Sequence, residues 1–378
     1  MSHDPRRMRA LVVLTQPPLP EGGAPGKTAV GLLRGLREHG VDVRAVAARR
    51  GSSFAGDVPA DLPVELVDVE PPGPWEARLG RLRRPLGELG SGSFAARVRE
   101  AASEADVLHL EETETAWAGE GIGLPSLVHV HFLARRDRDL GAPWRKQFRE
   151  VLDGSRAERA AARRHRHLVA SSPVVADALR AAAPRAEVVL APLSLDPALY
   201  EPAPLSGPPL AGLIGTARWG PTADAMRTLV RDVWPLVARA APEARLVVAG
   251  RGTSELGLPQ SSGVDLLGEV DSARDLFQRL SLLLFPLARG SGMKVKTLEA
   301  MASGVPVVTT VAGAEGIEPS DGVIVHEDPE LLAAAAAELL DDAQARRERG
   351  AAARADFVRR YSPRPATEPL VELYRRMA

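Results

Sequence analysis

The chain has 378 residues, of which 45% are hydrophobic, a formal net charge of −1 and no cysteine. Its length is typical of two domains, each able to bury its own core. The near-neutral charge does not indicate a nucleic acid or an anionic membrane as partner. The absence of cysteine excludes disulfides, thiolate metal sites and a cysteine nucleophile, and it fits a reducing compartment.

The first residues carry positive charge ahead of a short apolar run, as secretory signals do. Residues 10–14 form that run after Arg6, Arg7 and Arg9, but it is shorter than the apolar core of a signal, and a proline-rich turn follows it. We therefore expect a first β-strand here. No segment approaches the ~18 uninterrupted apolar residues of a membrane span, so we expect a soluble, cytoplasmic protein.

Short, nearly all apolar runs alternate with amphipathic helical patterns from end to end. Such runs are typical of parallel strands buried on both faces. Strands are predicted at residues 11–14, 41–46, 107–110, 127–130, 168–170 and 188–190, then at 213–215, 246–249, 282–285, 305–309 and 323–325. Helices are predicted at 28–38, 222–240 and 330–340, among others. The alternation predicts an α/β fold with doubly wound parallel sheets.

A proline-rich stretch divides the chain into two parts. Residues 197–209 contain five prolines, which disfavour helix and sheet alike and indicate a linker. We therefore predict one domain over residues 1–196 and a second over residues 210–361.

The most informative segment is residues 285–317. A strand ends at its start, a glycine loop follows at residues 290–292, and a helix is predicted over residues 293–302. The free amides and the dipole of such a helix start bind anions at the carboxyl ends of parallel strands. Lys294 and Lys296 oppose the dipole there, which makes sense if an anion such as a diphosphate binds.

Glu299 follows Lys296 by about one helical turn. A carboxylate at this position can accept hydrogen bonds from the vicinal hydroxyls of a ribose. The same residues equally fit a solvated helix face after an ordinary loop, and composition alone does not decide between the two interpretations.

The segment closely resembles the carboxyl-terminal signature of retaining GT-B glycosyltransferases of glycosyltransferase family 4. There, a glycine loop leads into a helix of the form Lys-x-Leu-Glu-Ala-Met-Ala-x-Gly-x-Pro-Val-Val. The matching residues are Lys296, Leu298, Glu299, Ala300, Met301, Ala302, Gly304, Pro306, Val307 and Val308, followed by Gly313, Glu315 and Gly316. Weaker matches at residues 11–23, 189–202 and 215–250 extend the resemblance over most of the chain, and residues 51–166 resemble the family least.

The resemblance implies a GT-B fold, in which two Rossmann-like domains face a central cleft. The first domain would hold the acceptor and the second a nucleoside-diphosphate sugar. It further implies retention of configuration, no obligatory metal or other cofactor, and a final helix within residues 362–378 that returns to the first domain. Which sugar, which base and which acceptor are involved stays open, as does the oligomeric state.

The resemblance also implies roles for single residues. Glu299 would bind the ribose, Arg218 and Lys296 would neutralise the leaving nucleotide, and His131 would face the transferred sugar. The glycines of the first loop would let the backbone approach the diphosphate, and Val270 would lie near the base. The implied catalytic residues are His131, Arg218 and Lys296, and the implied donor-binding residues are Gly22, Gly23, Arg218, Val270, Ser291, Gly292, Met293, Lys294, Val295, Lys296 and Glu299.

Three residues depart from the family pattern. Ser291 stands where the family often has a second glutamate that contacts the sugar, no lysine follows Arg218 closely, and Thr222 stands where a related subgroup has asparagine. These departures leave open a protein that binds the donor without transferring the sugar.

A weaker alternative is a nucleoside-triphosphate hydrolase. Residues 22–28 read GGAPGKT between a strand and a helix and resemble a Walker loop. The spacing fails, because four residues must separate the two glycines and the first glycine position would then fall on Glu21.

Three other patterns have ordinary structural interpretations. An apolar stripe rich in neighbouring arginines would be a membrane-surface helix or, as we favour, a helix packed on the core. The basic run at residues 156–167 indicates a solvated helix face. His129 and His131 do not form a metal site without a third ligand, so we predict no metal. The stripe consists of Trp75, Leu79, Leu82, Leu86 and Leu89, interrupted by Pro85.

Overall fold

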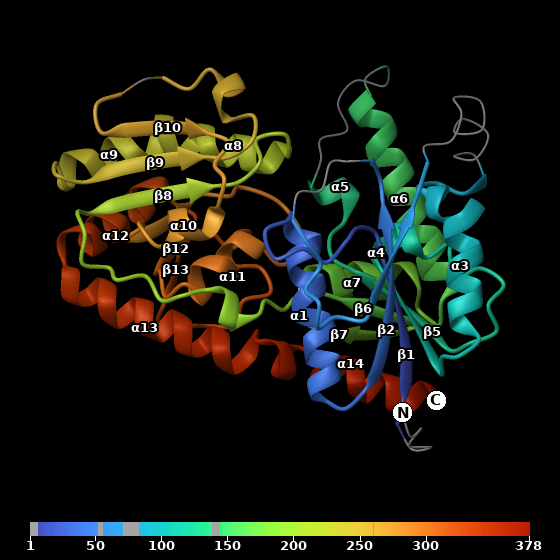
Figure 1. The fold of residues 1–378 in the computed structure, drawn as a ribbon. Coiled ribbons are helices and arrows are strands. Elements are labelled where there is room, and N and C mark those ends of the chain that lie inside the picture. Colours follow the sequence, from blue (N-terminus) through green and yellow to red (C-terminus); the bar gives the residue numbers. More distant parts are fainter. Residues whose placement is uncertain (1–6, 52–55, 71–82, 138–143, 145, 260) are drawn as a thin grey trace. The chain divides into compact units, whose positions relative to one another are not determined.

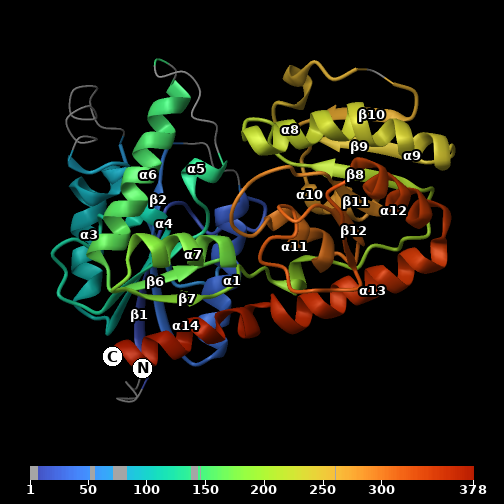
Figure 2. The same ribbon diagram turned by 180° about the vertical axis from the view of Figure 1, so that it is seen from behind.

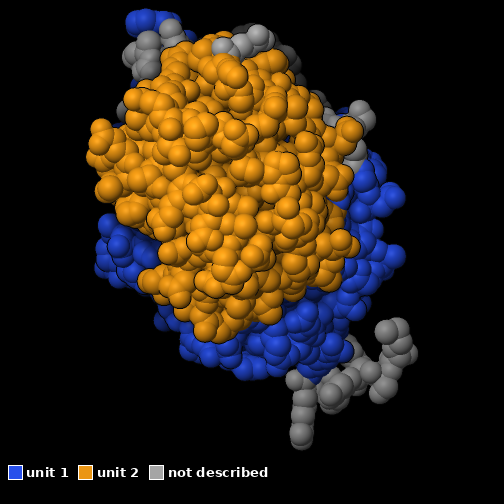
Figure 3. Space-filling view, turned by 90° about the vertical axis from the view of Figure 1, so that its left-hand side faces the viewer, with its two compact units in different colours: residues 1–135, 139–196, 362–378 blue, residues 136–138, 197–361 orange. Residues whose placement is uncertain are grey.

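The computed structural model describes residues 7–51, 56–70, 83–137, 144, 146–259 and 261–378. The chain forms two compact units, which Figure 3 shows in different colours. Unit 1 comprises residues 1–135, 139–196 and 362–378, and unit 2 comprises residues 136–138 and 197–361. Each unit is built around one parallel sheet with helices packed on it, which confirms the predicted α/β class.

Unit 1 contains a seven-stranded parallel sheet with the order β3-β2-β1-β4-β5-β6-β7 (Figure 1). The strands are β1 (Arg9–Leu14), β2 (Asp42–Arg49), β3 (Val64–Asp68), β4 (Val107–Glu111), β5 (Ser126–Val130), β6 (His167–Ala170) and β7 (Glu187–Leu190). The six strands predicted for this half are all present. The edge strand β3 was not predicted, because its residues alternate between apolar and charged and are only partly buried.

The helices of unit 1 cover both faces of its sheet (Figures 1 and 2). They are α1 (Ala24–Glu38), η1 (Gly87–Gly90), α3 (Gly92–Ala102), α4 (Glu112–Thr115), α6 (Lys146–Arg164), α7 (Pro173–Ala182) and α14 (Pro363–Met377), while the residues of the short α5 (Ala134–Asp137) are divided between the two units.

The two faces of this sheet differ in chemistry. Leu108 and Leu110 of β4 join an apolar core with α3 and α7. Since side chains alternate along a strand, His109 and Glu111 point to the opposite face. That face is covered by α1 and α14, and Tyr374 of α14 reaches the ring of His109.

Unit 2 contains a six-stranded parallel sheet with the order β10-β9-β8-β11-β12-β13. The strands are β8 (Leu210–Ile214), β9 (Arg245–Ala249), β10 (Val264–Gly268), β11 (Leu282–Phe285), β12 (Val307–Thr309) and β13 (Val323–Val325). The helical segments are η2 (Pro197–Leu199), α8 (Gly220–Thr228), η3 (Leu229–Val233), α9 (Trp234–Ala240), η4 (Thr253–Leu256), α10 (Ala273–Phe277), α11 (Val295–Ala302), α12 (Pro329–Asp341) and α13 (Ala343–Arg360). Only the partly buried edge strand β10 was not predicted.

The helix predicted over residues 222–240 is interrupted. A π-helical turn, η3, separates α8 from α9, and Pro235 lies in the first turn of α9. Proline cannot donate the usual backbone hydrogen bond, so a locally wider turn relieves its conflict with the preceding residues. The periodicity predicted the helix but not its interruption.

The apolar stripe and the basic run predicted from the sequence both lie partly within the described residues. Of the apolar stripe, Trp75, Leu79 and Leu82 lie outside the described residues, and Leu89 is buried in the core of unit 1. In α6, Arg163 and Arg164 are exposed, so the basic run forms a solvated helix face there. Within the described ranges, no helix has the length and apolar character required to cross a lipid bilayer.

The last helix, α14, packs closely on α1 within unit 1. A Cβ atom added to Gly35 of α1 would lie 2.2 Å from the carbonyl oxygen of Pro363 and 2.5 Å from Oγ1 of Thr367. The missing side chain therefore allows the two helix backbones to approach each other.

We predict that Gly35→Ala lowers the melting temperature by about 5 °C. Alanine gains about 1 kcal/mol in helix propensity, but the overlap with Pro363 costs more because a backbone carbonyl cannot move aside. Gly123→Ala is the matched control, because a Cβ there would meet no atom of the described residues within 4 Å. Equal thermal unfolding curves for the two variants would contradict the close helix approach.

Candidate functional site

The strand order of unit 2 reverses direction between β8 and β11, which lie side by side. Ligands of open α/β sheets bind outside the carboxyl ends of the strands at such a reversal. Here β8 leads through Gly215 into α8, and β11 leads through residues 286–294 into α11. The segment singled out in the sequence therefore starts at the expected ligand-binding edge.

Two glycines allow close packing at this edge. A Cβ on Gly250 would lie 2.0 Å from the carbonyl oxygen of Gly215, and the φ of Gly250 is 127°, a backbone conformation open to glycine. A Cβ on Gly215 would lie 2.9 Å from Cε of Lys296. The missing side chains thus leave room for Lys296 beside the end of β8.

Lys296 lies in the first turn of α11, and its ammonium group reaches the start of α8 and the end of β11. Its Nζ donates to Oγ1 of Thr222 at 3.2 Å and lies over the rings of Phe285 and Trp219, at 4.6 and 5.5 Å from their centroids. Burial and the nearby charge of Lys294 lower the pKa of Lys296 to about 8, against an opposing effect of Glu299. The ammonium group has few protein partners for its charge, and an anion would stabilise it.

Lys294 has a different environment, although it is only two residues away. Its buried Nζ donates to the carbonyl oxygens of Ser291 and Gly292 at 3.1 and 2.5 Å, and it lies 3.9 Å from the buried carboxylate of Glu315. Burial lowers the pKa of Lys294, while Glu315 and Asp137 act in the opposite direction. This lysine therefore closes the glycine loop internally.

The start of α11 is arranged to receive negative charge. Lys294 is the N-cap residue, no side chain among the described residues caps the helix there, and its first turn contains no acidic residue. Gly290 and Gly292 have φ values of 144° and 72°, which shape the loop before the helix. Gly292, Met293 and Val295 lie in this loop and first turn, where backbone amides and the helix dipole favour an anion.

Glu299 faces a residue that the sequence did not single out as a partner. Its Oε1 accepts a hydrogen bond from the hydroxyl group of Tyr200 at 3.2 Å, and both side chains are buried. The guanidinium of Arg274 lies 6.0 Å from the ring centroid of Tyr200. Tyr200 therefore holds the carboxylate of Glu299 in one orientation.

Ser291, the residue that departs from the family pattern, carries a carboxylate partner. Oδ1 of Asp137, which groups with unit 2, accepts hydrogen bonds from the backbone N–H and from Oγ of Ser291, at 2.7 and 2.5 Å. Burial raises the pKa of Asp137, and these bonds together with Lys294 partly offset that effect. The carboxylate of Asp137 thus lies beside residue 291, although residue 291 itself is a serine.

Arg218 and Val270 lie in the loops after β8 and β10. Arg218 is exposed, and its charge contributes to the lowered pKa of Glu269, behind the direct hydrogen bonds from Arg251. Val270 is half-buried. Both therefore lie at the carboxyl edge of the same sheet as Lys296, at positions accessible to a ligand.

The remaining predicted residues, Gly22, Gly23 and His131, belong to unit 1. Gly22 ends a turn in which its N–H donates to the carbonyl of Leu19 at 3.0 Å, and Gly23 is the N-cap of α1. A Cβ on Gly22 would lie 3.0 Å from Cβ of Leu19. The loop thus brings bare backbone to a helix start at the carboxyl end of β1.

His131 follows β5 and lies between two carboxylates. Its Nε2 is 2.7 Å from Oε2 of Glu111 and its Nδ1 is 3.4 Å from Oε1 of Glu112. Burial alone would lower the pKa of His131, but the two carboxylates outweigh burial and raise it to about 10. Conversely, burial opposes ionisation of Glu111, and the histidines around it hold the pKa of that carboxyl well below its usual range.

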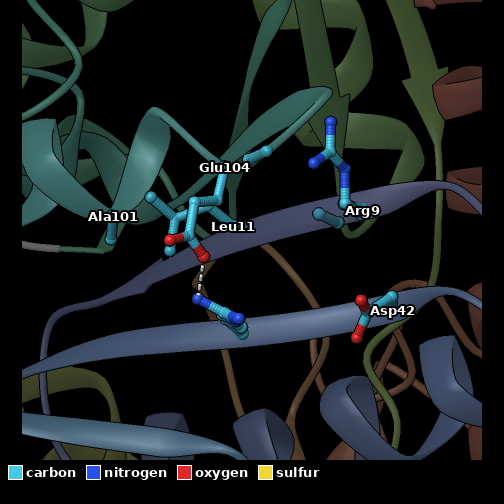
Figure 4. Close-up of a pocket in the computed structure, with 8 residues that line it drawn as sticks. Arg9, Leu11, Asp42, Ala101 and Glu104 are labelled. Atoms are coloured by element: carbon cyan, nitrogen blue, oxygen red, sulfur yellow. Dashed lines mark hydrogen bonds and ion pairs between the residues drawn. The ribbon is translucent and has the colours of Figure 1, made fainter. Parts of the chain in front are cut away.

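A separate pocket lies at the amino ends of the unit 1 strands, and its lining residues include no histidine. Figure 4 shows Arg9 of β1, Asp42 of β2 and Glu104, which follows α3. Arg9 pairs with Asp106 and Glu104 pairs with Arg44. The pocket lies at the amino ends of the strands, away from the ligand-binding edge of an open sheet.

Two family models match the chain. Residues 23–193 match the model described as Glycosyl transferase 4-like domain, and residues 208–342 match the model described as Glycosyl transferases group 1. No curated protein sequence matches the chain.

Solved structures share the fold over nearly the whole chain at low sequence identity. Sucrose-phosphate synthase from Thermosynechococcus elongatus has a TM-score of 0.71 and 16% identity, and the match covers 98% of this chain and 99% of that one. HepE from Anabaena, in complex with UDP and glucose, has a TM-score of 0.66 and 18% identity, with coverages of 98% and 100%. TarM from S. aureus has a TM-score of 0.69 and 10% identity, with coverages of 98% and 100%.

We predict that Glu315→Gln lowers the free energy of unfolding by about 2–3 kcal/mol, because it leaves the buried ammonium of Lys294 without its carboxylate. Glu330→Gln, at an exposed position of the same unit, is the control. Combining Glu315→Gln with Lys294→Met should recover part of the loss, since the ammonium group that Glu315 offsets is then removed as well. Denaturant unfolding measures all three, and a Glu315→Gln variant as stable as the control would refute the pairing.

Proposed function

We propose that this chain, a glycosyltransferase of the GT-B fold, transfers a sugar from a nucleoside-diphosphate donor with retention of configuration. The observation that carries the proposal is the start of α11 in unit 2. Lys296 places a weakly partnered ammonium group there, at the point where the strand order reverses.

The diphosphate would bind at this helix start. The amides of residues 292–296 would donate to its oxygens and to the sugar hydroxyls, and Lys296 would neutralise the charge that develops on the leaving nucleotide. Arg218, exposed after β8, would add a second cation. Glu299 would accept hydrogen bonds from the ribose hydroxyls, held in place by Tyr200.

The sugar subsite would use the carboxylate of Asp137 at Ser291. This carboxylate would contact the sugar, as a glutamate at the position of Ser291 often does in glycosyltransferase family 4. The resemblance further assigns His131 to the transferred sugar and the backbone of Gly22 and Gly23 to the diphosphate. The transfer would need no metal ion, because amides and cations stabilise the leaving group.

HepE binds UDP, and uridine diphosphate is therefore the first nucleotide to test. A panel of nucleotide sugars in a thermal-shift assay identifies the donor, and release of the nucleoside diphosphate in the presence of candidate acceptors demonstrates transfer. Stabilisation by a donor without release for any acceptor would favour a binding protein. Stabilisation by ATP with magnesium, lost in Lys27→Ala, would favour the hydrolase instead.

We predict that Glu299→Ala weakens binding of the nucleoside diphosphate about 10- to 100-fold, because two ribose hydroxyls lose a charged acceptor. Tyr200→Phe should weaken it less, since the carboxylate remains but loses its fixed orientation. Calorimetric titration measures both, with Glu330→Ala as the matched control. Unchanged affinity in a folded Glu299→Ala variant would refute the ribose assignment.

We also predict that binding of the nucleoside diphosphate takes up protons near pH 8. With a pKa of about 8, Lys296 is about half protonated at that pH, and a bound diphosphate raises its pKa. Affinity should therefore fall as the pH rises through 8. Calorimetry in buffers of different ionisation enthalpy measures the uptake, and its persistence in Lys296→Met would assign the proton to another group.

A further inference from the structure

A polar cluster lies on the face of the unit 1 sheet that α1 and α14 cover. It comes from two short patterns on neighbouring strands, His-x-Glu at residues 109–111 of β4 and His-x-His at residues 129–131 at the end of β5. In the parallel register, Glu111 lies opposite His129. Alternation along each strand then directs all four side chains to the same face.

The three imidazole rings converge on one carboxylate. Oε1 of Glu111 lies 2.7 Å from Nε2 of His109 and 2.9 Å from Nδ1 of His129, and Oε2 lies 2.7 Å from Nε2 of His131. The exposed fractions are 0% for His109, 6% for Glu111, 3% for His129 and 9% for His131. Four groups that could each carry charge are thus taken out of water together.

Hydrogen bonding does not satisfy the whole cluster. Nε2 of His129 is buried and, among the residues that the structure describes, has no hydrogen-bond partner. Oγ of Ser194 is also buried and has no hydrogen-bond partner within the described part of the chain. His129, His131 and Ser194 line one small cavity beside the cluster. Buried polar atoms without partners are uncommon and often mark an ion or water that completes the site.

We propose that His109, Glu111 and His129 bind a divalent transition-metal ion, with zinc as the best fit. One ligand atom from each of the three residues can be chosen so that all lie within 4.8 Å of one another. Two imidazoles and one carboxylate are a recurrent donor set for such ions. Tetrahedral zinc holds its ligand atoms about 3.3 Å apart, so Nε2 of His109 and Nδ1 of His129, at 2.7 and 2.9 Å from Oε1 of Glu111, would each move away from that oxygen by about half an ångström.

The surroundings of the three residues support this assignment. Nδ1 of His109 lies 2.5 Å from the hydroxyl group of Tyr374. Metal-binding histidines usually engage a second polar group through the other ring nitrogen, which fixes the ring orientation. The adjoining cavity offers space for a water molecule as a fourth ligand, with Ser194 and His131 as its polar neighbours.

The ion would be structural. It would join the carboxyl ends of β4 and β5 and, through Tyr374, would anchor α14 on the sheet. The proposal does not depend on the sugar transfer, because none of the three ligands belongs to the residues assigned to the donor. It does change one expectation from the sequence: the third ligand that His129 lacked is supplied by the neighbouring strand.

The test uses the full-length protein, stripped with EDTA and transferred to metal-free buffer. After incubation with zinc chloride and gel filtration, elemental analysis should find one zinc per chain. Zinc about a hundredfold above its dissociation constant should raise the melting temperature by about 5 °C or more. His129→Gln and Glu111→Gln should lose both effects, whereas His326→Gln, a histidine of unit 2, should retain them.

Cobalt chloride gives a readout that does not depend on the stability of the variants. Cobalt bound by two imidazoles and a carboxylate in the unsubstituted protein should show visible absorption bands that zinc abolishes by competition. The proposal is wrong if the protein retains no zinc after incubation and gel filtration and shows no such bands with cobalt. The cluster is then a hydrogen-bonded network without an ion. Equal zinc retention in a folded His129→Gln variant would overturn it as well.

Discussion

The candidate donor site depends on one constraint, the reversal of strand order between β8 and β11. Because these strands lie side by side and their connections leave in opposite directions, a crevice forms where both carboxyl ends emerge. The loops after Ile214 and Phe285 therefore approach each other there. Lys296, in the first turn of α11, meets Thr222 in the first turn of α8 and Trp219 at the N-cap of that helix. The sheet topology thus brings together Lys296 and Thr222, which are 74 positions apart in the sequence.

Within this site, two neighbouring lysines have different functions because their partners differ. Lys294 is enclosed by carbonyl groups and Glu315, so its charge is used to hold the glycine loop. Lys296 has a hydroxyl group and two aromatic rings, which satisfy its charge poorly and lower its pKa. An anion gains most from a cation that the protein has not already neutralised. The difference makes Lys296 the stronger candidate for contact with the diphosphate.

The sequence predicted the fold class and most strands, because apolar runs alternating with amphipathic helices are a local signal. Edge strands β3 and β10 were missed since half-exposed strands lose that signal. The signature at residues 285–317 located the donor segment for the same reason, as its residues are contiguous. Tyr200 beside Glu299 and Asp137 beside Ser291 could not be predicted, because each pair is about 100 or more residues apart and joins only through tertiary packing.

The polar residues of the cluster around Glu111 are visible in the sequence, but a search for apolar runs passes over them. Within β4, apolar Leu108 and Leu110 flank His109, and within β5 apolar Val128 and Val130 flank His129. This alternation in two central strands, both buried on each face, is unusual, since parallel strands of this kind are normally apolar on both sides. Polar groups retained in such a position must be satisfied by each other or by a bound species, because water cannot reach them.

In unit 1, the apolar face supplies the core, and the polar face specifies where α14 binds by pairing His109 with Tyr374. The polar residues therefore give the final helix a defined position that apolar packing alone would leave less specific.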